Sequence, residues 1–169
     1  MTNEESIKSQ LEEKFEFLKD KIKVTRSRRI FTEYLSQDDF KVAFTYVVEN
    51  LQFQHLCTIT GLDEKEFYGF IYHLARPDGI MLNLKSSASK ENPVIETITS
   101  HFPGGDIYER EIEDLLGVKV EGLPAGNRYP LPDGWPPGQH PLRKDWYPEV
   151  LSEAKNPVTT DKETEKSAS

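Results

Sequence analysis

The spacing of apolar residues predicts an α+β fold over residues 1–117. Apolar side chains recur every three or four residues over 4–22 and again after Ser36, which predicts two amphipathic helices, the second with Ser36 as its N-cap. Residues 23–35 are rich in β-branched and aromatic side chains and lack a helical period, so we expect one strand there. The second helix is expected to bury one apolar face: Phe40, Ala43, Phe44, Val47, Val48 and Leu51.

The middle of the chain alternates between apolar and polar positions, as strands do. Residues 56–60 and 67–75 flank a polar turn that contains a glycine, which predicts a hairpin. Residues 80–84 alternate again after the turn Pro77–Gly79. We therefore expect an antiparallel meander with the 23–35 strand added at one edge, giving a mainly antiparallel sheet of about four strands packed with helices.

Two further helices are expected before residue 118. Pro93 stands at the first position of an apolar stripe over 92–102. Asp106 is followed three residues later by Glu109, as in a capping box, and Gly117 stands where a left-handed C-cap belongs. This pattern predicts a second helix over 106–116.

The composition changes after Gly117. Seven prolines lie between residues 124 and 148, which prevents helix and disfavours a central strand. The same stretch contains large apolar residues that a disordered linker usually lacks, so we interpret 118–151 as an extended arm that docks on a partner. The alternative is that the arm folds back over its own domain. Residues 152–169 are polar, and we expect a disordered tail.

Composition restricts the classes of function. The net charge of −8 argues against a nucleic-acid-binding protein, and we expect the basic cluster over 21–29 to be a solvated face or a docking edge. The single cysteine, Cys57, excludes disulfides within the chain and four-cysteine metal sites, and its apolar neighbours predict burial.

The chain is expected to be cytoplasmic and to have no membrane-spanning segment. No stretch approaches the roughly 20 consecutive apolar residues of a membrane-spanning helix. The first residues are acidic and do not resemble a signal peptide. Membrane contact is therefore expected only through partner proteins.

The candidate chemistry is sparse. No two histidines have the spacing of a helical metal pair, and no phosphate-binding glycine loop is present, so we expect no metal, flavin or other cofactor in this chain. The acids between Glu109 and Asp114 could run acid–base chemistry, although we favour solvated or interface charge. Arg110 and Asp114 are four residues apart and are expected to pair. Two alternatives stay open: a small enzyme that uses these acids with His140 nearby, and an adaptor that binds partners transiently.

Two motifs point to a family. Residues 109–118, EREIEDLLGV, resemble the E-R-E-x-x-D-L-x-G-I signature of the respiratory complex I 30 kDa subunit family, whose bacterial members belong to NADH:quinone oxidoreductase. Residues 140–146, HPLRKDW, resemble the second motif of that family. Between the motifs, 122–128 lacks the histidine of the quinone-reductase branch, and 133–138 is similar to subunits of membrane-bound, energy-converting [NiFe] hydrogenases.

The resemblance implies a non-catalytic assembly subunit in the cytoplasmic arm of an ion-pumping redox complex. Such a subunit lies beside a large subunit that carries the [NiFe] site or its descendant, and the iron–sulfur clusters are expected in partner subunits. The favoured complex is a ferredoxin-dependent hydrogenase or a sulfur-reducing relative, and the alternative is NADH:quinone oxidoreductase.

The resemblance also implies which residues meet the partners. Arg143 and Asp145 are expected to be ion-pair partners across or within the interface, and Pro141 to fix the backbone between them. The expected partner-binding residues are Glu109, Arg110, Glu111, Asp114, Trp135, His140, Pro141, Arg143, Lys144, Asp145 and Trp146.

Overall fold

The computed structural model describes residues 2–26 and 28–148 and has the expected α+β fold. The expected disordered tail, 152–169, lies outside the described residues. The elements, in chain order, are α1 (Asn3–Lys14), the 3₁₀ turn η1 (Glu16–Leu18), β1 (Ile22–Arg26), β2 (Arg29–Leu35), α2 (Gln37–Glu49), β3 (His55–Asp63), β4 (Phe67–Ala75), β5 (Met81–Ser89), β6 (Val94–Glu96), the 3₁₀ turn η2 (Pro103–Gly105), α3 (Asp106–Leu116) and β7 (Lys119–Glu121).

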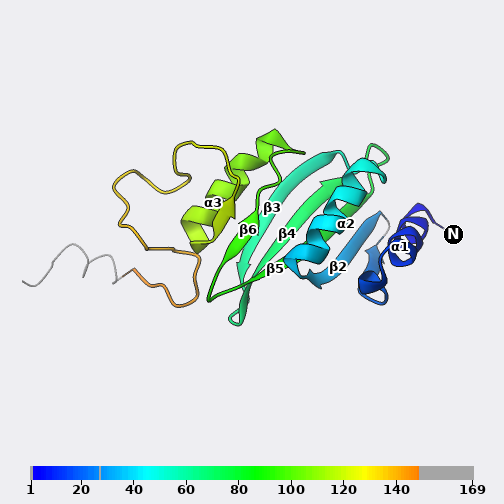
Figure 1. Ribbon diagram of the computed structural model, residues 1–169, viewed down its shortest axis with the longest axis horizontal. Coiled ribbons are helices and arrows are strands. Elements are labelled where there is room, and N and C mark those ends of the chain that lie inside the picture. The colour runs from blue at the N-terminus through cyan, green and yellow to red at the C-terminus, as the bar shows by residue number, and fades with distance from the viewer. Residues whose placement is uncertain (1, 27, 149–169) are drawn as a thin grey trace, which may run out of the picture.

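The main sheet has five strands in the order β1-β2-β5-β4-β3. The predicted meander is confirmed, because β4 pairs antiparallel with both β3 and β5. β2 joins it in parallel with β5, and β1 lies at the edge, antiparallel to β2. Figure 1 shows α2 across one face of this sheet, α1 near β2 and α3 beyond β3.

The N-terminal elements are shorter than predicted. The single strand expected over 23–35 is wrong: β1 and β2 form a hairpin, and Arg28 takes a positive φ of 63° at its turn. The helix expected over 4–22 is also wrong beyond Lys14. Phe15 leaves the helical conformation and packs edge-on against Tyr46 of α2, with ring centroids 5.4 Å apart. This break lets Leu18 turn into the core, where it is fully buried.

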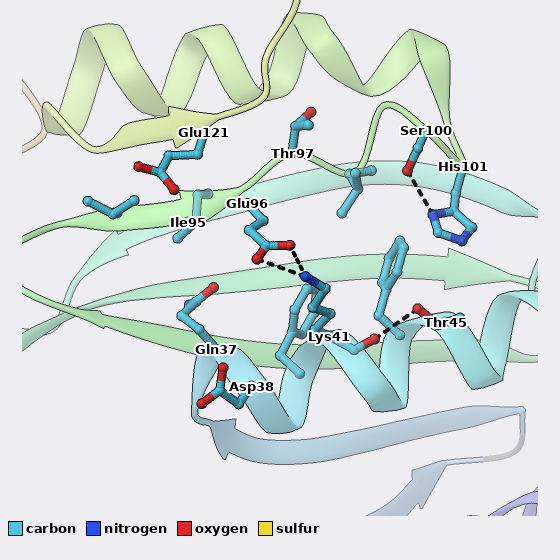
Figure 2. A pocket seen from close by; sticks show the side chains of 14 residues that line it. Gln37, Asp38, Lys41, Thr45, Ile95, Glu96, Thr97, Ser100, His101 and Glu121 are labelled. Carbon is cyan, nitrogen blue, oxygen red and sulfur yellow. Dashed lines mark hydrogen bonds and ion pairs between the residues drawn. The ribbon is translucent and has the colours of Figure 1, made fainter.

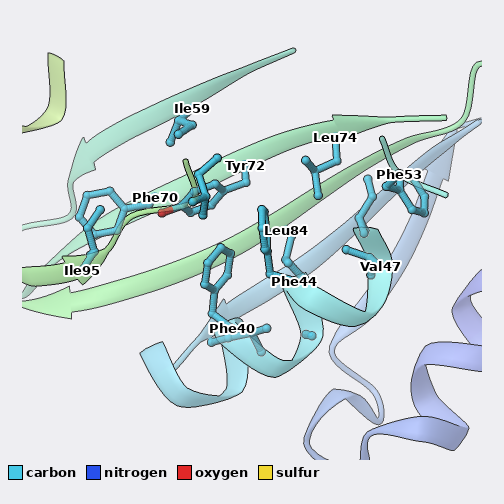
Figure 3. Close-up of a cluster of buried hydrophobic side chains, with 14 of the residues drawn as sticks. Phe40, Phe44, Val47, Phe53, Ile59, Phe70, Tyr72, Leu74, Leu84 and Ile95 are labelled. Atoms are coloured by element: carbon cyan, nitrogen blue, oxygen red, sulfur yellow. The ribbon is translucent and has the colours of Figure 1, made fainter. Parts of the chain in front are cut away.

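The core lies between α2 and the sheet (Figure 3). Ser36 caps α2 as predicted, because its hydroxyl accepts a hydrogen bond from the Asp39 N–H at 3.1 Å. Phe40 and Phe44 of α2 pack on Tyr72 of β4, with centroid distances of 4.4 and 5.9 Å. The remaining apolar positions of α2 follow the predicted helical period.

The helix predicted over 92–102 is wrong. Residues 94–96 form β6, which pairs in parallel with β7 and buries Ile95. The stretch is rich in β-branched residues, and its apolar spacing fits a short strand as well as a helix. The partner strand brings Val118 and Val120 into the core, so the packed domain extends to residue 121.

The last helix, α3, is confirmed over 106–116. Gly117 ends it with a left-handed φ of 70°, and its N–H donates to the Glu113 carbonyl at 3.0 Å. The helix packs beside β3, where Gly61 leaves room: a Cβ at that position would lie 2.8 Å from Leu116 Cδ1. The expected capping box is absent, because Asp106 is already helical and Glu109 points elsewhere.

The other expectations about single residues have mixed outcomes. Cys57 is only half-buried on β3, and its carbonyl accepts a hydrogen bond from the Tyr108 hydroxyl at 3.1 Å. In the basic cluster near the β1–β2 turn, Lys23, Arg28 and Arg29 are exposed and Lys21 is half-buried. No helix in the described ranges is long and apolar enough to cross a membrane.

Candidate functional site

The first signature acid, Glu109, has a structural role. Its carboxylate is fully buried and accepts hydrogen bonds from the Ile98 N–H at 2.7 Å and the Thr97 hydroxyl at 2.5 Å. Burial raises the pKa of Glu109, although the hydrogen bonds from Thr97 and Ile98 oppose it. Glu109 therefore holds the chain after β6 against α3.

The last signature acid, Asp114, binds the arm. Its carboxylate accepts hydrogen bonds from Arg128 Nε at 2.7 Å and from the Leu131 N–H at 3.1 Å. The predicted pair between Arg110 and Asp114 is therefore wrong. Arg110 instead donates to the Pro124 carbonyl at 2.5 Å, and its Nε lies 3.9 Å from the Asp106 carboxylate.

The second motif lies on the C-terminal end of α3. His140 Nδ1 donates to the Asp114 carbonyl at 2.8 Å, and the Leu142 N–H donates to the Leu115 carbonyl at 3.0 Å. Arg143 Nε donates to the Leu116 carbonyl at 2.7 Å. The last carbonyls of a helix have no partner within it and carry negative partial charge, so an arginine there is stabilising. The two motifs thus form one unit, in which HPLR caps the helix formed by EREIEDLL.

Arg143 and Asp145 do not pair with each other among the described residues, and an ion pair across an interface stays a prediction. The Arg143 guanidinium is occupied by the end of α3, and it lies over the Tyr68 ring at 5.7 Å from the centroid. The side chains of Lys144 and Asp145 are exposed, and Pro141 is half-buried between His140 and this exposed stretch.

The backbone at Lys144 is anchored by a residue that the motifs do not include. The Lys144 N–H donates to Asp63 Oδ2 at 3.0 Å, and Lys90 Nζ lies 2.6 Å from Asp63 Oδ1. Burial alone would raise the pKa of Asp63. Hydrogen bonds from Lys90 and from the Lys144 and Lys65 N–H groups outweigh burial and lower the pKa to about 2.

The tryptophans of the arm pack against each other. The rings of Trp135 and Trp146 are 6.1 Å apart, and both indole N–H groups bond to Gln139. Other large side chains of the arm remain in solvent: Tyr129 is 43% exposed, Leu142 51% and Tyr147 53%. The arm therefore folds back on α3, as the alternative interpretation expected, and its outer surface carries exposed apolar side chains; docking on a partner stays a prediction.

A separate cleft of about 280 Å³ lies between α2 and β6 (Figure 2). Phe40 and Phe44 line its apolar side, and an exposed ion pair between Lys41 and Glu96 crosses it with an Nζ–Oε2 distance of 2.6 Å. None of the sequence-predicted site residues lines this cleft.

The candidate catalytic residues around α3 are engaged within the protein. Glu109 and Asp114 are occupied by structural hydrogen bonds, and His140 reaches a backbone carbonyl rather than a carboxylate. Residues 2–26 and 28–148 contain no group of three or more acids, histidines or cysteines that could hold a metal ion. Sequence reasoning missed Asp63 and Arg128, because the partners that give them their roles, Lys90 and Lys144 for Asp63 and Asp114 for Arg128, are 14 to 81 residues away in the chain.

The fold and this site define a class: an α+β domain whose last helix is capped by its own C-terminal arm. The chain belongs to the family described as respiratory-chain NADH dehydrogenase, 30 Kd subunit, whose model matches residues 33–150. The resemblance carried by the two motifs is therefore confirmed.

The chain is similar to subunits of a dehydrogenase, a hydrogenase and a sulfur reductase. A subunit of the F(420)H(2) dehydrogenase of Methanosarcina mazei is 34% identical over 116 residues, which cover 67% of this chain and 73% of that protein. The beta subunit of the membrane-bound hydrogenase of Pyrococcus furiosus is 27% identical over 151 residues, covering 86% and 87%. A chain in the solved structure of the membrane-bound sulfane sulfur reductase, an archaeal respiratory membrane complex, shares the fold with a TM-score of 0.76 at 24% identity, covering 98% of both chains.

Proposed function

We propose that this chain is a non-catalytic assembly subunit in the cytoplasmic arm of a membrane-bound, ion-pumping redox complex. In this role it docks on a large subunit of the [NiFe] type and contacts an iron–sulfur subunit. The family assignment supports membership of such a complex, as do relatives named as subunits of a dehydrogenase and of a membrane-bound hydrogenase. The redox cofactors are expected in the partner subunits, and this chain reaches the membrane only through them.

The outer surface of the arm is the observation that carries the proposal. Internal hydrogen bonds hold the arm in place at Asp114, Leu115 and Leu116, so little chain entropy is left to lose on binding. Yet Tyr129, Leu142 and Tyr147 remain about half-exposed. Aromatic residues on a preorganised surface are typical of protein interfaces.

A ferredoxin-dependent hydrogenase or a sulfur-reducing relative is the favoured complex. The 133–138 segment resembles subunits of that branch, and the match to the Pyrococcus furiosus hydrogenase protein extends over most of both chains. The alternative is the corresponding member of NADH:quinone oxidoreductase, which the description of the family itself favours.

A pull-down tests the proposal. The tagged full chain is coexpressed with the large and iron–sulfur subunits of its host, as wild type, Tyr147→Ala, Lys144→Glu and a variant lacking 123–146. Tyr147→Ala should weaken capture of the large subunit at least about fivefold, the loss typical of an interface anchor. Lys144→Glu reverses one charge of the second motif. Because the Lys144 side chain is exposed, the hydrogen bonds of Arg143 to the end of α3 stay intact.

The control is Val42→Ala, whose side chain is 49% exposed on α2; Figure 1 shows this helix apart from the arm. Circular dichroism of each isolated variant reports whether the domain stays folded. Undiminished capture by the deletion variant would contradict docking through the arm. An unfolded deletion variant would show that the arm chiefly completes this chain's own domain.

A further inference from the structure

The acids of α3 divide into those used inside the protein and one that is not. Glu109 and Asp114 accept the hydrogen bonds described above, and Glu113 Oε1 accepts one from the Val120 N–H at 3.0 Å. Glu111 differs from them. Within the described ranges, 2–26 and 28–148, its carboxylate has neither a hydrogen bond nor an ion pair.

Glu111 lines a groove of about 260 Å³ between α3 and the edge strand β3. Thr58 and Thr60 of β3 form one wall, and Leu115 of α3 lies on the other. Leu142 from the second motif completes the groove, held there by the hydrogen bond from its N–H to the Leu115 carbonyl. We call this site the Glu111 groove. Both family motifs therefore contribute to it with side chains that have no role in capping α3.

The chemistry of the groove selects one kind of ligand. An unpaired carboxylate excludes anions and favours a cation, and its apolar neighbours favour a side chain rather than a hydrated ion. A Ca²⁺ or Mg²⁺ site needs several oxygen ligands, whereas this lining has one carboxylate among leucines, isoleucines and threonines. Leu142 is 51% exposed, so an apolar group that covers it gains burial.

We propose that the Glu111 groove receives a partner-protein segment that carries an arginine or lysine next to an apolar side chain. The cation meets Glu111, and the apolar side chain packs between Leu115 and Leu142. This inference rests on the proposed function, because it assumes a partner within a complex. It assigns Glu111 the interface role, while Glu109 and Asp114 build the helix and arm that form the groove.

The first test uses the assembled complex, purified from its host through a tag on the full chain. Glu111→Gln and Leu142→Ala are compared with Glu13→Gln, an exposed acid on α1, and with Val42→Ala, an equally exposed apolar residue on α2. The rate at which this protein leaves the complex should rise about tenfold for the two groove variants, as expected when one member of an interface pair is removed. Both controls should dissociate like wild type.

Salt dependence separates a charge contact from a shape effect. Wild-type dissociation should accelerate with added salt, and Glu111→Gln should lose part of that dependence. The isolated Glu111→Gln chain should have the same melting temperature as the isolated wild-type chain, because the carboxylate has no described internal partner. Unchanged dissociation and unchanged salt dependence for Glu111→Gln would overturn the proposal.

The second test places a photocrosslinking amino acid at position 142 of the full chain. The crosslinked peptide should come from another protein of the same complex and contain an arginine or lysine within a few residues of the attachment point. A peptide without a basic residue would overturn the groove assignment and leave the proposed function standing. A wild-type chain that copurifies with no large subunit would instead overturn the proposed function, and the groove assignment with it.

Discussion

Replacing Asp63 by asparagine should destabilise the protein in a pH-dependent way. Asp63 joins three segments, since it accepts hydrogen bonds from the Lys65 and Lys144 N–H groups and pairs with Lys90. Its side chain is only 2% exposed, so solvent screens these contacts weakly. The pKa falls from 3.8 to about 2, which corresponds to about 2 kcal/mol of folding free energy at neutral pH.

The pH window follows from the direction of that change. The pKa is lower in the folded state than in the unfolded state, so the contribution is complete above about pH 4 and is lost as the pH falls towards 2. Asparagine keeps the shape but has no charge to titrate. The variant should therefore be about 2 kcal/mol less stable than wild type at pH 7, and the difference should shrink towards zero near pH 2.

Urea unfolding of the full chain at pH 7 and near pH 2, followed by circular dichroism, measures the effect. The control is Glu96→Gln, which removes an exposed ion pair with Lys41 in which both side chains are 62% exposed. Such pairs contribute about 0–1 kcal/mol. An equal loss of stability in Asp63→Asn at both pH values would refute the electrostatic reasoning, as would a loss at pH 7 no larger than that of the control.

The remaining predictions concern the buried acid, the tail and cofactor content. Glu109→Ala should lower the unfolding free energy by about 1–3 kcal/mol because it leaves the Ile98 N–H and the Thr97 hydroxyl without a partner. Glu109→Gln should lower the unfolding free energy less, because burial already disfavours the charged form of the carboxyl. Thermal melting of the two variants compares these losses. Truncation after Leu151 should leave capture of the large subunit unchanged, as a pull-down would show; a loss would reveal docking by the tail. The purified, tag-free chain should contain no stoichiometric iron, nickel, zinc or flavin by elemental analysis and absorbance, and any of these would contradict a cofactor-free subunit.

Local sequence patterns were sufficient to predict those helices and strands whose pattern fits only one type of secondary structure. The helical period behind Ser36 runs for a dozen residues, and only a helix places those side chains on one face. The alternation in 67–75 is equally specific, and Gly117 marks the end of α3 because glycine adopts the left-handed conformation readily. The two motifs, each a short run of side chains, were also readable without a structure.

Where a segment or side chain had more than one possible partner, only the tertiary structure determined which partner it contacts. Residues 92–102 have an apolar pattern that suits either a helix or a strand, and pairing with β7, some 25 residues later, selects the strand. Arg110 was a plausible partner for Asp114, but a surface pair four residues apart contributes only a few tenths of a kcal/mol. Arg128 displaces it because the fold brings the arm to Asp114, where a partly buried, charge-assisted hydrogen bond is stronger. Which acids of α3 form internal hydrogen bonds, and which does not, likewise depends on the groups that pack against each one. The spacing of the acids along the helix does not contain that information.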